Sequence, residues 1–166
     1  MSNSPDIFIG IRNLPETKII GMKMQMTFAG NRTSELWRRF MPRRKEIRNA
    51  VSDDLFSIQI YSGDFDFSRF DVNMPFEKWA GREVPDFSFV PAGMEALVLD
   101  EGSYAVFIHR GAASEGEKTF RHIFGEWLPG SGYKIDLRPH FEILGKKYKN
   151  EDPDSEEEIW IPLYEE

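Results

Sequence analysis

Glu142 is the residue whose surroundings in the sequence best predict chemistry. Its carboxyl group lies within the run Pro139–Leu144, where strand alternation puts Phe141 and Ile143 on one face and Glu142 and Leu144 on the other. If the Phe141 face covers a helix, Glu142 faces a cleft. A carboxylate shielded from water is costly to ionise unless a cation compensates it, so such a site would favour a cationic ligand. From the residues alone, an exposed glutamate on the polar side of a sheet is the commoner case.

Aromatic side chains that could surround a cation occur in other strand-like segments of the chain. The candidates are Tyr61, Trp79, Phe107 and Trp160, together with His109, which shares a strand face with Phe107. An aromatic wall attracts a cation by about 0.5–2 kcal/mol. Each of these residues taken alone is at least as typical of a core, because large aromatic side chains dominate protein interiors.

Several other chemistries lack the residues that they require. The chain contains no cysteine, which excludes disulfides, thiolate metal sites and a cysteine nucleophile. His109, His122 and His140 are far apart and show no metal-ligand spacing, and no Gly-x-Ser-x-Gly elbow is present. The acidic segment 149–158 lacks the central glycine of an EF-hand loop. We therefore predict no catalytic residue, no metal ligand and no cofactor.

The composition is that of an ordinary globular domain. The chain has 166 residues, of which 40% are hydrophobic and 30% charged, so one domain is expected. No apolar run approaches the roughly 20 residues that span a bilayer, and the N-terminus has no secretory pattern. We expect a cytoplasmic protein that does not contact membranes. The net charge of −7 also disfavours direct nucleic-acid binding.

One basic segment departs from this acidic average. Residues 33–48 combine helical spacing of apolar side chains with six basic residues, and Pro42 should divide the helix. A solvated helix face is the first interpretation, and a contact with a protein or a nucleic acid is the second.

The order of patterns predicts two similar units. Strand-like alternation over 18–28 and 55–61 and an extended stretch over 76–84 enclose the basic helix. Extended segments over 95–98, 103–110, 141–144 and 159–163 enclose a helix over 116–127. We expect the order strand, helix, strand, strand twice, in repeats over about 17–85 and about 86–164. The acidic segment 149–158 is predicted to be a solvated loop, with packed structure only from Ile159.

Four segments together resemble the GyrI-like effector-binding domain. They are Ser103–Gly111, the helix that ends at Glu126–Pro129, Pro139–Ile143 and Glu158–Pro162. Ala80-Gly81-Arg82-Glu83-Val84 is also similar to a run in the family's third strand. The resemblance extends from about Ile19 to Leu163 and leaves no room for the helix-turn-helix domain that many relatives carry.

The resemblance implies an α+β fold of duplicated β-α-β-β (SH2-like) units, with a pseudo-two-fold axis and a central ligand cleft, in one domain over 1–166. In this family, which includes AraC-type regulators, a buried acid holds cationic aromatic compounds, and Glu142 is the matching residue. A standalone member would be a sensor or sequesterer of such multidrug-type ligands, with a protein partner left open. The alternatives are a hydrolase of strained cyclopropane-containing compounds and a DNA gyrase-interacting inhibitor.

Overall fold

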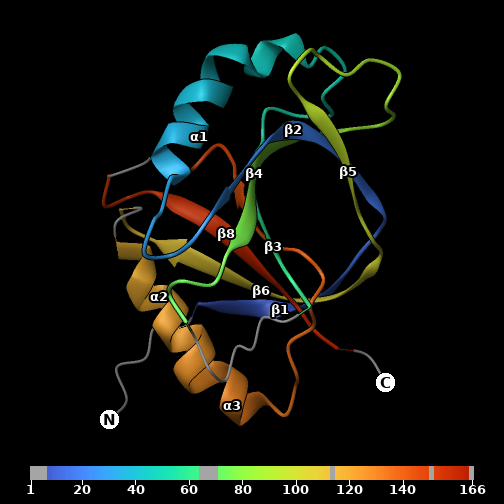
Figure 1. Cartoon of the computed structure of the whole chain (residues 1–166). Coiled ribbons are helices and arrows are strands. Elements are labelled where there is room, and N and C mark those ends of the chain that lie inside the picture. Colours follow the sequence, from blue (N-terminus) through green and yellow to red (C-terminus); the bar gives the residue numbers. More distant parts are fainter. Residues whose placement is uncertain (1–6, 64–70, 113–114, 150–151, 165–166) are drawn as a thin grey trace.

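The computed structural model describes residues 7–63, 71–112, 115–149 and 152–164 (Figure 1). These residues form one eight-stranded antiparallel sheet, with helical segments packed on it. The strands are β1 Phe8–Leu14, β2 Thr17–Met26, β3 Leu55–Tyr61, β4 Phe76–Val84, β5 Glu95–Leu99, β6 Gly102–Arg110, β7 His140–Leu144 and β8 Glu156–Pro162. The helical segments are α1 Thr33–Phe40, the 3₁₀ helix η1 Met41–Glu46, α2 Gly116–His122, the π-helix η3 Ile123–Trp127 and α3 Leu128–Ser131.

The strand order confirms the duplicated β-α-β-β architecture. The order is β1-β6-β8-β7-β3-β4-β2-β5, and it reads symmetrically about the boundary between β7 and β3. Each strand of the second unit therefore has a counterpart: β6 matches β2, β7 matches β3, and β8 matches β4. The outermost strands are exchanged, because β1 pairs with β6 and β5 pairs with β2. The sequence patterns did not predict β1.

The sheet curls so that its two ends approach each other. Two-residue connections join β1 to β2 and β5 to β6, although these strands lie at opposite ends of the sheet order. Figure 1 shows β2 and β5 arching around one side of the molecule. The curled sheet surrounds a cluster to which every strand contributes, and we call it the inner cluster. Its members include Leu14, Ile19, Ile58, Trp79, Leu99, Tyr104, Phe141 and Trp160.

The helices cover the outer face of the sheet. Leu36 and Phe40 of α1 pack on β2 and β4, in what we call the α1 cluster. Ile123 packs with Phe107 of β6 and with β8, in the α2 cluster. Figure 1 shows α1 and the α2–α3 segment on the same side of the sheet, at opposite ends of it. The central strands β3 and β7 run between these two clusters in the sheet order.

Gly81 of the family-like run and its partner Gly21 have a steric role. Gly81 of β4 pairs with Gly21 of β2, where the two strands approach closely. A Cβ atom added at Gly81 would lie 2.8 Å from the carbonyl oxygen of Ile20. A larger residue would force the strands apart, so the pairing explains why glycine occupies both positions.

The two largest differences from the expected boundaries are at the end of the second helix and at the start of β8. The second helix continues to Ser131, because Pro129 lies in the first turn of α3, where a missing backbone donor is tolerated. The solvated-loop prediction for 149–158 was wrong at its end, because β8 already begins at Glu156 and pairs with β6. Residues 150–151 of that segment lie outside the described residues. The basic helix is divided as expected: α1 ends at Phe40, and Pro42 lies in the first turn of the 3₁₀ helix η1.

Candidate functional site

A strip of polar side chains crosses the outer face of the sheet between the α1 and α2 clusters. We call it the polar strip, and its members are Ser57, Gln59, Lys78, His109, His140, Glu142 and Glu157. Strand pairing brings them together: Gln59 lies opposite both Lys78 and His140, and His109 lies opposite Glu157. Residues from five strands thus meet where neither helix supplies an apolar cover.

Alternation in β4 directs one cation into this strip. Trp79 belongs to the inner cluster, so its neighbour Lys78 points to the outer face. Only 6% of Lys78 is exposed, which is rare for a lysine unless its ammonium group has partners. Burial lowers the pKa of Lys78, whereas the charges of Glu142 and Glu157 act in the opposite direction.

Gln59 links Lys78 to the neighbouring strand β7. We orient its amide so that Lys78 Nζ donates to the Gln59 oxygen at 2.7 Å, while the Gln59 nitrogen donates to the His140 carbonyl oxygen at 3.0 Å. The opposite orientation would face donor to donor and acceptor to acceptor. The amide atom 3.4 Å from Glu142 Oε1 is then the oxygen, which accepts and cannot donate to this carboxyl group.

Glu142 and Glu157 form a carboxyl pair across β7 and β8. Glu157 is 9% exposed, and Glu142 is half-buried. Burial, the charge of Glu142 and a hydrogen bond between the two side chains raise the pKa of Glu157 to about 9, and Lys78 opposes this shift. The physical cause is that two adjacent carboxylates out of water repel each other unless one keeps its proton.

Aromatic rings lie next to the carboxyl pair on the side of α1. The Tyr61 ring is 5.0 Å from the His140 ring and 5.7 Å from the Phe76 ring, and Phe28 lies 4.7 Å from Phe76. Burial and then the charge of Glu142 raise the pKa of Tyr61, which therefore keeps its hydroxyl proton. Phe28 is 36% exposed, so this aromatic group reaches the surface.

The two buried histidines differ in what surrounds them: burial keeps His140 neutral, and His109 has two local partners. Burial lowers the pKa of His140 to about 3, so its ring is neutral at physiological pH. His109 Nε2 lies 2.9 Å from the Ala112 carbonyl oxygen, and His109 Nδ1 lies 2.6 Å from Thr119 Oγ1 of α2. These two contacts fix the His109 ring between β6 and α2.

Of the residues predicted to form the site, the structure brings only some together. Glu142, Tyr61 and His109 lie on the outer face, as does Phe107, which is covered by Trp127 with ring centroids 5.0 Å apart. Trp79 and Trp160 belong to the inner cluster, so the sheet separates them from Glu142.

The assumption about which face of β7 meets a helix was also reversed. Phe141 and Ile143 pack in the inner cluster, and Glu142 lies on the side that carries the helices. The opposite directions of Phe141 and Glu142 were nevertheless correct.

Sequence reasoning missed Lys78, Glu157 and the ring of Phe28. A signal for Lys78 existed, since it interrupts the apolar strand around Trp79. Glu157 lies two and four positions before Ile159 and Ile161, so it shares their face of the strand. The acidic run around it nevertheless suggested a solvated loop.

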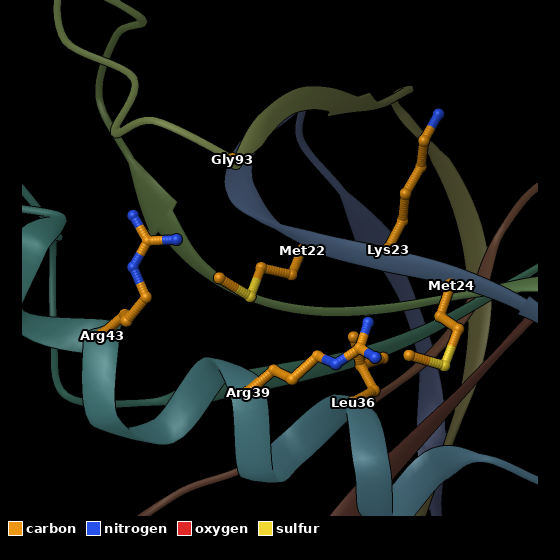
Figure 2. Close-up of a pocket in the computed structure, with 7 residues that line it drawn as sticks. All are labelled: Met22, Lys23, Met24, Leu36, Arg39, Arg43 and Gly93. Atoms are coloured by element: carbon orange, nitrogen blue, oxygen red, sulfur yellow. The ribbon is translucent and has the colours of Figure 1, made fainter.

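A separate groove of about 400 Å³ lies on the β2 side of α1. Figure 2 shows Met22 and Met24 on β2 facing Leu36 and Arg39 of α1, while Lys23 points away. Arg39 is paired with Glu35 at 2.7 Å, and Arg43 with Glu46 at 2.7 Å. These exposed ion pairs engage two of the six basic side chains of the segment and fit the interpretation of a solvated helix face.

The described residues place no three His, Asp or Glu side chains where they could hold a metal ion. None of the helices in this part of the chain has the length and hydropathy of a bilayer-spanning segment.

The symmetric sheet with two helical covers is the architecture of a GyrI-like effector-binding domain. A family model described as integron-associated effector binding protein matches residues 10–163, and the chain belongs to this family.

Relatives with other names share this region or its fold. The transcriptional regulator BrlR of Pseudomonas aeruginosa is 27% identical over 151 residues, which are 90% of this chain and 53% of BrlR. The chain thus spans about half the length of this curated relative.

Two solved structures show the same fold. SAV2435 bound to tetraphenylphosphonium has a TM-score of 0.73 at 14% identity, covering 95% of this chain and 93% of that chain. An integron cassette protein from Vibrio cholerae has a TM-score of 0.63 at 15% identity, covering 95% of this chain and 98% of that chain.

Proposed function

We propose that this chain binds a lipophilic, aromatic cation on the outer face of β3 and β7. Glu142 is the anionic partner of the ligand, and Tyr61 is an aromatic wall beside it. The observation that carries the proposal is the half-buried carboxyl group of Glu142 next to an aromatic group and between the two helix-covered clusters.

The chemistry of this place fits a cation with spread-out charge. A compact, strongly hydrated cation would lose its water shell at a half-buried site, whereas an aryl cation gives up little hydration. The rings of Tyr61, Phe76 and Phe28 offer apolar area and cation–π attraction of about 0.5–2 kcal/mol each. A protein of the same fold has been solved with tetraphenylphosphonium, a cation of this kind.

The remaining candidate residues have different roles in this proposal. Phe107 and His109 shape the end of the strip near α2. Trp79 and Trp160 stiffen the central strands from the inner face, where Trp160 stacks on Phe141 at 5.3 Å. These two tryptophans therefore support the strands without touching the ligand.

Binding without chemistry suits a sensor or a sequesterer in the cytoplasm. BrlR is named a transcriptional regulator and is about twice as long as the matched region, so a regulatory readout would require a further protein segment or partner. A sequesterer requires only the site itself.

The proposal is tested by isothermal titration with tetraphenylphosphonium and with triphenylphosphine oxide, a neutral aryl compound. We expect saturable binding of the cation and at least tenfold weaker binding of the neutral compound. Glu142→Gln should weaken cation binding at least tenfold with the circular dichroism spectrum unchanged. Glu158→Gln is the matched control, because Glu158 accepts from Trp160 Nε1 and lies on the inner face of the neighbouring strand β8. Equal cation affinity in wild type and Glu142→Gln would reject the role of Glu142.

A hydrolase is the second candidate, because a protonated carboxyl beside a second carboxyl group can act as an acid and base pair. Mass spectrometry of the recovered ligand distinguishes the two functions. An unchanged ligand supports the binding module, and a ligand that has gained water indicates the hydrolase.

A further inference from the structure

We propose that binding of a cation at Glu142 is coupled to the release of one proton from the Glu142–Glu157 pair. The chain then exchanges a proton for its ligand, and its affinity for the ligand depends on pH. This inference rests on the proposed function, since it concerns the same site.

The charges of the polar strip carry the argument. Lys78 supplies one positive charge, and the two carboxyl groups would supply two negative charges if both were ionised. If the carboxyl pair retains one proton, Lys78 and the pair together carry no net charge, and the raised pKa of Glu157 agrees with this state. A bound cation adds one positive charge. The O–H bond of the carboxyl pair then breaks, and the proton passes to the solvent. The charges of Lys78 and the bound cation balance those of the two carboxylates.

The hydrogen bonds of the strip favour the same location for the proton. Gln59 turns its oxygen toward Glu142, so it offers no donor to a carboxylate. Glu142 lies opposite Ile159, two positions from Glu157 on the same face of β8, so the two carboxyl groups are neighbours, and a hydrogen bond between them would require one proton. A cation at Glu142 offers the charge that the shared proton had balanced.

The other titratable groups around Glu157 do not provide this proton. On β6, the two ring nitrogens of His109 contact the Ala112 carbonyl oxygen and Thr119 Oγ1 rather than the carboxyl pair. On β7 and β3, the low pKa of His140 and the raised pKa of Tyr61 keep both uncharged. Lys78 on β4 is the remaining source, and a variant separates it from the pair.

The experiment is titration of the intact chain with tetraphenylphosphonium in phosphate and in Tris at pH 7, since the two buffers differ in their enthalpy of ionisation. The difference in apparent binding enthalpy gives the number of protons released. We expect close to one proton per cation, and an affinity that rises up to tenfold per pH unit until the pair is ionised. Binding with no proton release would overturn the inference and leave the proposed function intact. No binding at all would refute both.

Two variants identify the proton donor, after circular dichroism has shown that each is folded. Glu157→Gln should bind the cation more weakly and release no proton. Lys78→Met should also release none, but it should bind more tightly at pH 7, because the pair then carries an uncompensated negative charge that the ligand neutralises. Proton release retained in Glu157→Gln would assign the proton to Lys78 and overturn the proposal. If either variant is unfolded, the proton count of the wild type still tests whether cation binding releases a proton.

Discussion

Replacing Glu157 by glutamine should change how the stability of the fold depends on pH. The pKa of Glu157 is about 9 in the folded chain, against an ordinary value of 4.5. Below pH 4.5 both the folded and the unfolded state hold the proton. Between the two values only the folded state holds it, so unfolding releases a proton and the free energy of unfolding falls as pH rises. Glutamine carries no titrating proton and removes this dependence.

The magnitude follows from the width of that window. One proton released on unfolding changes the free energy by about 1.4 kcal/mol per pH unit. At pH 7, which is about 2.5 units above the pKa of Glu157 in the unfolded chain, Glu157 ionises on unfolding. This lowers the free energy of unfolding of the wild type by about 3 kcal/mol. A chain of this length gains about 2–4 °C of Tm per kcal/mol, so the Tm difference should grow by about 3–6 °C per pH unit.

The assay is thermal and urea unfolding of both proteins from pH 5 to pH 8.5. A fixed offset from the new amide is expected, but the growing gap in favour of Glu157→Gln depends only on the proton. Parallel pH profiles for the two proteins would refute the buried, protonated carboxyl group.

Glu156→Gln is the matched control from the adjacent position. Arg110, with Lys147, lowers the pKa of Glu156, so this group stabilises the fold at neutral pH and loses that effect as pH falls. The variant should therefore be less stable than the wild type at pH 7 and should match it in acid. The two variants must differ from the wild type with opposite signs.

Three further substitutions separate the scaffold from the site. Gly81→Ala should lower the unfolding free energy by about 1–3 kcal/mol in urea titrations, because its Cβ would meet backbone atoms of Ile20, and Gly125→Ala, with open space around it, should not. Trp127→Ala should cost about 3 kcal/mol, because its ring packs on Phe107, yet it should leave the affinity for tetraphenylphosphonium within about threefold. Arg39→Ala should change the unfolding free energy by less than about 0.5 kcal/mol, and a larger loss would contradict its assignment to a solvated face.

Local sequence patterns predicted most of the strands, because alternation and runs of strand-forming residues need no knowledge of the partner strand. The segments 55–61 and 76–84 match β3 and β4 at both ends. β1 was missed because Ile9 and Ile11 are exposed, and its place as a strand depends on pairing with the distant β6. The symmetric order of the strands could be inferred from the repeated order of elements, but the exchange of β1 and β5 could not.

The candidate site was predictable only in part, for a related reason. Alternation separates Glu142 from Phe141, but it does not say which face of a strand receives the helices. The burial of Glu157 depends on Glu142 and Lys78, which come from other strands, and nothing in the local acidic run shows it. Trp79 was included in the predicted site because it is aromatic, but its neighbour Lys78 is the residue that points to the outer face.

The most direct test of the account is a crystal structure of the chain with tetraphenylarsonium, located by the anomalous signal of arsenic. We predict one arsenic site on the outer face, beside the Glu142 carboxyl group and within about 6 Å of the Tyr61 ring. An arsenic site in the groove lined by Met22 and Arg39, or against Trp79 on the inner face, would contradict the central role of Glu142.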